Sequence, residues 1–439
     1  MRSAHLHGGT FHSRTCPFLT ALAIGLGSFS LMACGDAAKG DPTAESGAIP
    51  AESHGRLVIV GGGLSSENAD VYHAVLEGRD GNGPFCVMPT ASGVPEESMN
   101  SAVERFTGYA ADARYSGMSA EVTGLWITTE NPEAASDSTM VERIEACSGF
   151  WFVGGVQSRV MQVFRPATGD SPGYRALMRR WREGAVVAGS SAGAAMMSSR
   201  SIGSGTPAAA LEFGVVRDAD GDGEEDGEGV WLLPGMDFVP WAIVGQHHLA
   251  RGRWGRLVVA VLEEEDRLGL GIDENTALVY DDDGIAEVVG ASGVLMFDVT
   301  GATPGDAPRT ATGIRVEFLG AGDRVDVRTL AVTRSTAGKA QPTPPPVADA
   351  SGGAAPDEDG ITPPTIDEIA ADPFARWALL HLLHAFAAGT VDEVALDGGA
   401  RTLTLRRAPG FASWARAEEG VQGTPAGLSA GPLTLDITR

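Results

Sequence analysis

Basic residues are scarce in this chain, and their scarcity limits the partners it can have. Its 439 residues contain 32 Lys and Arg against 57 Asp and Glu, which gives a formal net charge of −25 at pH 7. A protein that binds nucleic acid needs a clustered basic face, so we expect no nucleic-acid partner. The acidic balance is compatible with a soluble exported protein and favours a cationic substrate.

Long apolar runs and cysteines are also scarce. No apolar run after position 35 is long enough to span a bilayer. Of the four cysteines, Cys16 and Cys34 lie near the N-terminus, and only Cys86 and Cys147 lie beyond it. One pair does not make a disulfide framework. We therefore expect two buried thiols, although export permits a disulfide between them.

The N-terminal residues 1–33 are expected to be a signal peptide and not part of the fold. Positive charges precede an apolar stretch of small residues, Pro17–Ala33. This stretch and the following Cys34 resemble a bacterial lipoprotein signal with its lipobox, which implies lipidation of Cys34 and a membrane anchor. A plain secretory signal cleaved nearby is the alternative. Residues 34–54 are rich in small, acidic and turn-forming residues, and we expect a flexible tether there.

Apolar runs that alternate with helical segments predict an α/β fold over residues 55–335. Each run is continuously apolar, as buried parallel strands are, and each is followed by a turn and a helix-forming stretch. The alternation predicts a parallel sheet with helices on both faces and a site at the carboxyl ends of its strands. The expected strands are 56–60, 85–89, 121–128, 149–153 and 185–188, followed by 241–245 and 268–272.

The C-terminal part of the chain predicts further pieces of the same domain. Antiparallel strands are expected at 277–280, 285–289 and 294–299, where apolar stretches alternate with turns. Residues 336–364 are rich in Pro, Ala and Asp and predict a flexible insertion. Residues 365–439 then predict one amphipathic helix over 366–388 and a hairpin over 391–406. No internal repeat and no clear second domain is indicated.

An acidic insertion follows the fifth expected strand. Acidic residues alternate over 218–226, with Gly223 at the sixth position, as at the start of an EF-type calcium loop. The twelfth position is Gly229 instead of a bidentate Glu, and no helices are expected around it. The segment 218–229 is therefore either a weak calcium site or a solvated acidic insertion.

The most informative stretch is Gly189–Gly193, which reads Gly-Ser-Ser-Ala-Gly between a buried strand and a helix-forming run. A sharp turn of this kind exposes a serine hydroxyl at the edge of a sheet, beside backbone N–H groups that can hold an oxyanion. Ser191 is the candidate nucleophile, and the N–H groups of Ala192 and Gly155 are the candidate oxyanion donors. On this pentapeptide alone, a Gly/Ser-rich turn without chemistry is the alternative.

A base and a carboxylate are expected at two later strand ends. His247 follows directly after one buried strand, and Glu274 follows the next. Together with Ser191 they would form a nucleophilic triad, with Glu274 orienting the imidazole. His248 is the alternative base, because successive residues of a strand point to opposite faces. The order Ser–His–Glu differs from that of the α/β-hydrolases, in which the acid precedes the histidine.

Other polar residues and glycines are expected to be structural. Gly61–Gly63 follow the first strand without a subsequent Lys-Ser/Thr or the dinucleotide-binding spacing, so a plain strand–helix turn is expected there. His73 lies on a predicted helix. His381 and His384 stand at helical spacing with no acid or cysteine beside them, and we expect both at the edge of the core.

Several segments, in this order, resemble the cyanophycinase family of serine peptidases, which is related to the α-aspartyl dipeptidases. They are Pro89–Ser92, Phe152–Gln157, Gly189–Ala194, Gln246–Leu257 and Gly271–Ala277. The resemblance implies a flavodoxin-like α/β core similar to that of class I glutamine amidotransferases, with no metal or cofactor. It also implies that Ser191, His247 and Glu274 are the nucleophile, base and acid.

The same resemblance implies a substrate and the residues that bind it. The implied reaction is hydrolysis of the aspartate–arginine polymer cyanophycin to β-aspartyl-arginine dipeptides. The positions implied to line the substrate pocket are Gln157, Gln246, Arg251, Arg253 and Arg256.

Two departures from the family pattern bear on the substrate. Val156 stands where the family usually has an acid or amide, and Gly245 stands where it usually has Asp. A buried guanidinium needs a charged partner, so the loss of an acid weakens the prediction of cyanophycin more than that of hydrolysis. The alternatives are a peptidase for other β- or α-aspartyl peptides, and a surface lipoprotein that binds peptide or calcium without turnover.

Overall fold

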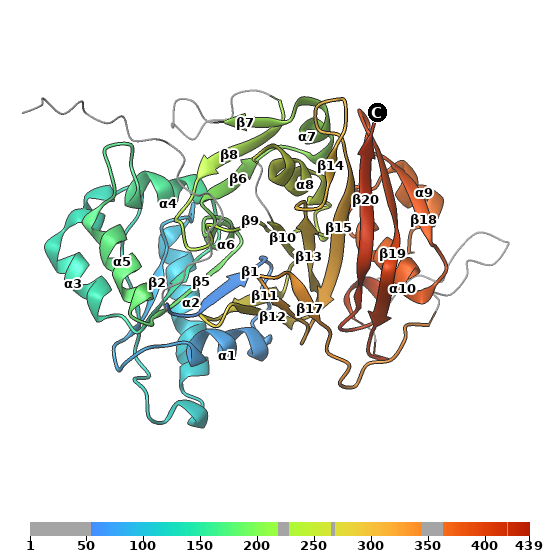
Figure 1. Cartoon of the computed structure of the whole chain (residues 1–439). Helices are drawn as coiled ribbons and strands as arrows, with labels where there is room; N and C mark the ends of the chain where they lie inside the picture. Colours follow the sequence, from blue (N-terminus) through green and yellow to red (C-terminus); the bar gives the residue numbers. More distant parts are fainter. Residues whose placement is uncertain (1–53, 218–227, 265–267, 344–362, 419) are drawn as a thin grey trace, which may run out of the picture. The chain divides into compact units, whose positions relative to one another are not determined.

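The computed structural model describes five stretches of the chain, residues 54–217, 228–264, 268–343, 363–418 and 420–439 (Figure 1). Several predictions fall on residues outside these stretches: the signal peptide 1–33, the lipidation site Cys34, the tether up to residue 53, the calcium candidate 218–226 and the central part of the insertion 336–364. No helix in the described stretches has the length and apolarity needed to cross a membrane.

The first sheet contains the predicted parallel strands. Its spatial order is β17 (Ala331–Thr333), β16 (Arg324–Asp326), β12 (Ile285–Gly290), β11 (Thr276–Tyr280), β1 (Leu57–Val60), β5 (Val186–Ser190), β4 (Gly149–Phe152), β2 (Phe85–Met88) and β3 (Val122–Gly124). Neighbours from β1 to β3 are parallel, whereas β11 is antiparallel to β1 and begins an antiparallel extension. The prediction of a parallel sheet followed by antiparallel strands is confirmed.

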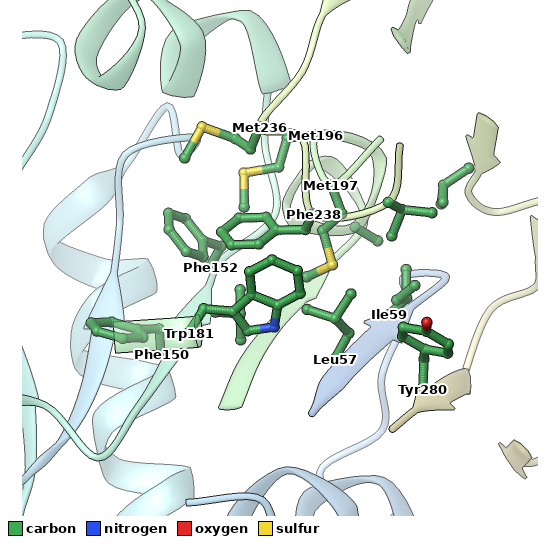
Figure 2. Close-up of a cluster of buried hydrophobic side chains, with 14 of the residues drawn as sticks. Leu57, Ile59, Phe150, Phe152, Trp181, Met196, Met197, Met236, Phe238 and Tyr280 are labelled. Carbon is green, nitrogen blue, oxygen red and sulfur yellow. The ribbon is translucent and has the colours of Figure 1, made fainter. Parts of the chain in front are cut away.

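Helices cover both faces of this sheet, as predicted. The helices of the described stretches are α1 (Ala69–Glu77), α2 (Pro95–Ala110), α3 (Ser138–Ala146), α4 (Gln157–Phe164), α5 (Pro172–Arg182), α6 (Ala192–Ala195), α7 (Pro207–Phe213), α8 (Trp254–Glu263), α9 (Ile366–Ala371) and α10 (Ala378–Ala388). Val58 and Val60 of β1 pack with α1 and α2. Leu57 and Ile59, on the opposite face, belong to a second cluster that also contains buried residues of α3, α4 and α5, among them Trp181 of α5 (Figure 2).

A second sheet, which the sequence did not separate from the first, carries two of the strands that lead to the site. Its order is β18 (Glu393–Asp397), β19 (Thr402–Trp414), β20 (Ser429–Thr438), β15 (Ala311–Gly320), β13 (Gly293–Asp298), β10 (Leu268–Ile272) and β9 (Ile243–Gly245), with β14 (Thr303–Pro304) beside β15. β9 and β10 are parallel to each other. A small third sheet contains β6 (Arg200–Ser204), β8 (Val230–Pro234) and β7 (Val215–Arg217).

The C-terminal region differs from its prediction in one respect. The single helix expected over 366–388 is wrong, because the chain forms α9 and α10 with a break that contains Pro373. Proline has no N–H and clashes with the preceding helical turn. A capping box of Thr365 and Glu368 starts α9, and α10 is buried on nearly all sides, so it is not amphipathic. The predicted hairpin is confirmed as the antiparallel pair β18 and β19.

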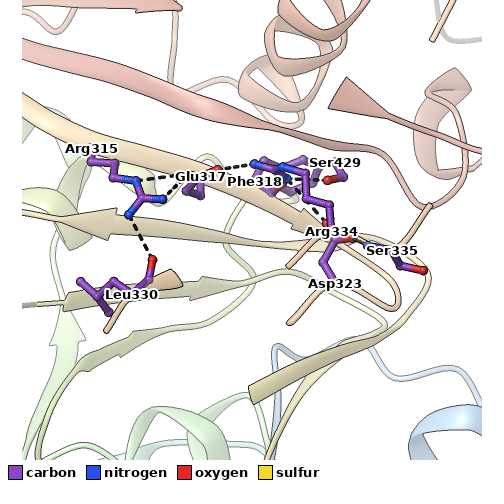
Figure 3. A network of polar contacts seen from close by, with 9 residues as sticks. Arg315, Glu317, Phe318, Asp323, Leu330, Arg334, Ser335 and Ser429 are labelled. Atoms are coloured by element: carbon purple, nitrogen blue, oxygen red, sulfur yellow. Dashed lines mark hydrogen bonds and ion pairs between the residues drawn. The ribbon is translucent and has the colours of Figure 1, made fainter. Parts of the chain in front are cut away.

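A buried network of charges joins the two large sheets (Figure 3). Glu317 on β15 accepts hydrogen bonds from Arg315, at 2.7 Å, and from Arg334, and it is 1% exposed. Arg334 and Lys339 both pair with the fully buried Asp323, at 3.7 and 3.3 Å. Asp323 lies in the turn between β15 and β16, the point where the chain passes from the second sheet to the first. Mutual pairing offsets the desolvation of these charges in part, because burial still raises the pKa of Glu317 and lowers those of Arg334 and Lys339.

Two further predictions are corrected by the packing. His54, expected in the tether, is 7% exposed, and its ring stacks on Trp181 with 4.7 Å between ring centroids. Cys86 and Cys147, expected as free thiols, form a disulfide with 6.0 Å between their Cα atoms. The parallel pairing of β2 with β4 causes this approach, since it places Phe85 opposite Gly149. The two cysteines come close because β2 and β4 are neighbours in the sheet, and the order of strands in a sheet cannot be predicted from the spacing of the cysteines along the chain.

Removal of the disulfide should destabilise the protein. It closes a loop with a sequence separation of 61, for which the chain-entropy model gives about 4 kcal/mol. We expect the double variant Cys86→Ser/Cys147→Ser to melt at a lower temperature than the wild type in thermal denaturation, and to be insensitive to a reductant that lowers the wild-type midpoint. Alkylation of Cys86 and Cys147 themselves in the unreduced, denatured protein, located by peptide mass, would contradict the disulfide.

Candidate active site

The three residues of the predicted triad meet where the two large sheets approach each other. Ser191 follows β5 of the first sheet, whereas His247 and Glu274 follow β9 and β10 of the second. The N–H of His247 donates to the carbonyl oxygen of Gly61 at 2.7 Å. The N–H of Asn275 donates to the carbonyl oxygen of Gly62 at 2.8 Å. Backbone hydrogen bonds to the loop after β1 therefore hold the two later strand ends beside Ser191.

The side chains form a continuous hydrogen-bonded chain. Ser191 Oγ lies 2.8 Å from His247 Nε2, and His247 Nδ1 lies 2.5 Å from Glu274 Oε1. Ser191 has φ 56° and ψ −112°, a conformation that is costly for a residue with a side chain. A sharp strand-to-helix turn imposes such a conformation and exposes the hydroxyl. The sequence-predicted Ser191, His247 and Glu274 are thus brought together.

Burial sets the protonation state of the imidazole. The His247 side chain is 6% exposed, and burial lowers its pKa to about 4, against the opposing effect of the Glu274 hydrogen bond. Arg251 nearby lowers the pKa further. At neutral pH the ring is therefore uncharged and can accept a proton.

The loop Gly61–Gly63 has a larger role than the plain turn that the sequence predicted. Gly62 has φ +112°, and a Cβ there would lie 2.1 Å from His247 Cε1. A Cβ on Gly63 would lie 2.9 Å from Glu274 Oε2. The loop thus lets the imidazole and carboxylate lie directly on the backbone. The feature of the sequence that could have indicated this close contact is the run of three consecutive glycines after a buried strand.

Asp273 is a site residue that the sequence reasoning missed. It is fully buried, and its Oδ1 accepts hydrogen bonds from the N–H groups of Leu249, at 3.1 Å, and Ala250, at 2.9 Å. Ser292 Oγ donates to Oδ2 at 2.7 Å. Burial raises the pKa of Asp273 to about 6, and these donors oppose the rise. Asp273 therefore fixes the turn that follows His247. In the sequence, its position directly before Glu274 was the feature that could have indicated this role.

His248, the alternative base, takes no part in the hydrogen-bonded chain with Ser191. Its ring is completely buried, burial lowers its pKa to about 3, and neither ring nitrogen has a partner among the described residues. A Cβ on Gly271 would lie 2.1 Å from its Cδ2, and the Cβ of any larger residue at Gly245 would lie 2.9 Å from its Nδ1. The imidazole thus occupies space beside Gly245, where the family usually has Asp.

The candidate oxyanion donors lie on either side of Ser191. Ala192 is the first residue of α6, so its N–H has no acceptor within the helix. The turn at Gly154 and Gly155 follows β4, and a Cβ on Gly154 would lie 3.4 Å from Ser191 Cβ. The N–H of Val156 donates to Ala91 O at 2.8 Å and fixes this turn to the neighbouring strand end.

The five residues expected to line a substrate pocket fall into two groups. Gln157 Nε2 donates to Ile202 O at 2.5 Å, and buried Arg256 donates to Gly205 O at 3.1 Å, so both bind the backbone of β6 or the turn after it. Arg253 donates to Gln246 Oε1 at 2.7 Å, and the exposed Arg251 lies 3.3 Å from Glu274 Oε1. Burial lowers the pKa of Arg256 to about 9 and that of Arg253 to about 10.

The other histidines behave as structural residues. His73 Nδ1 lies 2.8 Å from the hydroxyl of Tyr115, and His384 is buried, with Nε2 3.3 Å from Thr343 O. Within the described residues, no three His, Cys, Asp or Glu side chains are grouped so that they could hold a metal ion.

Part of the chain is similar in sequence to known proteins. Residues 57–288 match the model of peptidase family S51. The chain belongs to this family. It is 34% identical over 201 residues to cyanophycinases from Nostoc sp. and from Trichormus variabilis, a match that covers 44% of this chain and 61% of each relative. The S51 match begins at β1, ends within β12 and contains Ser191, His247 and Glu274.

A solved structure is also similar, although more distantly. The crystal structure of a peptidase from an acI-B1 Actinobacterium is 20% identical, with a TM-score of 0.43, and the similarity covers 63% of this chain and 98% of that one. The chain spans about 61% of the length of the curated relatives that it matches.

The burial of His247 predicts an unusually acidic titration. Because its pKa is lowered to about 4 from an ordinary value of 6.5, the ring should stay neutral down to mildly acidic pH and reach half protonation only at a pH of about 4. NMR titration of the ring proton resonances measures this midpoint, and the His247→Gln variant identifies the resonance by its disappearance. A midpoint near 6.5 would show that the ring is solvated.

A methyl group on Gly62 should disrupt the site without unfolding the chain. The Gly62→Ala Cβ overlaps the imidazole, so we expect the rate at which a fluorophosphonate labels Ser191 to fall roughly 100-fold, the effect of a small misplacement of a reacting group. Gly81→Ala is the matched control, because Gly81 also has positive φ, at +76°, but a Cβ there meets nothing within 4 Å. Equal labelling of the two variants would refute this role of Gly62.

Proposed function

We propose that this protein is an exported serine peptidase that cleaves amide bonds at aspartyl residues. The observation that carries the proposal is the hydrogen-bonded chain Ser191–His247–Glu274 at the end of β5, in a member of peptidase family S51. A neutral base beside a strained serine is what acyl transfer requires.

The proposed reaction begins with proton transfer from Ser191 Oγ to His247 Nε2 as the oxygen attacks the amide carbonyl. Glu274 accepts the Nδ1–H of His247 and stabilises the imidazolium that forms. The N–H groups of Ala192 and Gly155 hold the oxyanion, and such a donor contributes roughly 3 kcal/mol. His247 then protonates the leaving amine, and water, activated by the same base, hydrolyses the acyl-enzyme.

The proposed substrate is cyanophycin, which would release β-aspartyl-arginine dipeptides. The names of the relatives support this proposal, and so does Arg253, whose guanidinium group can bind the carboxylate of the aspartyl residue that is cleaved. The second candidate is a peptidase for other β- or α-aspartyl peptides. Val156 and Gly245 favour it, because neither supplies a charge for an arginine side chain.

The proposal of export rests on two observations. The N-terminal sequence resembles a lipoprotein signal that ends at Cys34, and the disulfide between Cys86 and Cys147 is typical of an oxidising compartment. Lipidation of Cys34 would anchor the protein to a membrane, and a secreted form is the alternative. Calcium binding by the acidic segment 218–226 stays a prediction.

Substitution of the nucleophile tests the function. We expect Ser191→Ala to lower turnover roughly 1000-fold or more while the melting temperature is kept. The wild type and the variant are incubated with cyanophycin and, separately, with β- and α-aspartyl peptides, and the products are identified by mass.

Each result decides between the candidates. Serine-dependent release of β-aspartyl-arginine would support cyanophycin as the substrate. Cleavage of other aspartyl peptides alone would keep the mechanism and discard that substrate. No cleavage, together with no labelling of Ser191 by a serine-directed probe, would replace the peptidase with a binding protein.

A further inference from the structure

A cavity borders Glu274 of the candidate triad. It has a volume of about 470 Å³ and is lined by Ala250, Arg251, Glu274 and Arg376. Ala250 and Arg251 follow β9, the strand that leads to His247, and Glu274 follows β10. Arg376 comes instead from the loop between α9 and α10, beyond residue 288, where the S51 match ends.

The loop that carries Arg376 is fixed to the segment after His247. The N–H of Trp377 donates to Leu249 O at 3.0 Å, and Trp254 Nε1 donates to Pro373 O at 2.9 Å. A Cβ on Gly252 would lie 1.9 Å from Phe374 O, so the two backbones are in direct contact. These contacts hold the position of residue 376 relative to the active site.

The cavity has an excess of positive charge. Arg251 and Arg376 contribute two guanidinium groups, whereas the single carboxylate, Glu274, accepts a hydrogen bond from His247 and pairs with Arg251 at 3.3 Å, so the charge of Arg376 is not compensated there. His247 is neutral at pH 7 because its pKa is lowered to about 4. Arg376 forms no hydrogen bond or ion pair with any other described residue, so its guanidinium is available to a ligand. This charge is opposite to that of the chain, which carries −25.

We infer that Arg376, together with Arg251, binds a carboxylate of the substrate outside the aspartyl residue that is cleaved. The inference rests on the proposed peptidase function and adds a binding residue supplied by the C-terminal region. Guanidinium groups bind carboxylates through paired, charge-assisted hydrogen bonds. The His247 ring separates Glu274 from Ser191, and Arg251 Nε lies 3.3 Å beyond, from Glu274 Oε1, so the proposed carboxylate site is close to the reacting centre but distinct from it.

Binding to the inactive Ser191→Ala variant tests the inference without turnover. Two aspartyl peptides are compared by calorimetry, one with all its carboxylates free and one with every carboxylate amidated except that of the scissile aspartyl residue. We expect the free form to bind roughly tenfold more tightly, as for a charge-assisted contact. When Arg376→Gln is combined with Ser191→Ala, the two peptides should bind with equal affinity. Arg376→Lys in the same background should keep part of the tenfold difference in affinity. The difference should also shrink at high salt.

The matched control is Arg182→Gln, which removes the same charge from an exposed position on α5. The inference fails if Arg376→Gln keeps the tenfold difference, if Arg182→Gln removes it equally, or if neither peptide binds. Turnover by the protein with Ser191 intact separates this inference from the proposed function. Cleavage without an effect of Arg376 overturns the inference alone, whereas an Arg376-dependent difference in binding without cleavage supports the cavity and overturns the peptidase.

Discussion

The imidazole of His247 lies directly on the backbone of Gly62, and the His247 N–H donates to Gly61 O at 2.7 Å. This contact joins the end of β1 in the first sheet to the end of β9 in the second. Ser191 follows β5, the parallel neighbour of β1, so its distance to His247 depends on how the sheets are aligned. The buried charges around Glu317 and Asp323 connect the same sheets elsewhere. The site therefore depends on packing between sheets as much as on any single loop.

The sequence predicted the parts of this site that local patterns determine. Buried strands, the sharp turn at Ser191 and the strand ends before His247 and Glu274 all follow from short apolar runs and glycines. The assignment of β9 and β10 to a second sheet could not be predicted, because their sequences resemble those of the first sheet. The roles of Gly62 and of the pair Cys86–Cys147 depend on residues that are distant along the chain. The break at Pro373, by contrast, was visible in the sequence and was missed.

The distribution of charge distinguishes the site from the rest of the molecule. The chain is strongly acidic, yet arginines surround the hydrogen-bonded chain of the site, and burial lowers the pKa values of Arg253 and Arg256. Such a local positive field inside an acidic protein attracts a carboxylate while the outer surface repels polyanions. Beside it, His248 fills the space next to Gly245 with an uncharged ring. The second departure from the family pattern therefore changes both the charge and the volume available there.

The position of His54 has a practical consequence for handling the protein. Its ring is packed on Trp181 just before β1, whereas Gly61 at the other end of that strand contacts the active site. An extended strand advances roughly 3.3 Å per residue, so these two residues lie roughly 20 Å apart. A bead, a surface or a fluorophore attached ahead of His54 would join the folded unit at the end of β1 remote from Ser191. Immobilisation through this side should leave the edge that carries Ser191, His247 and Glu274 open to solution.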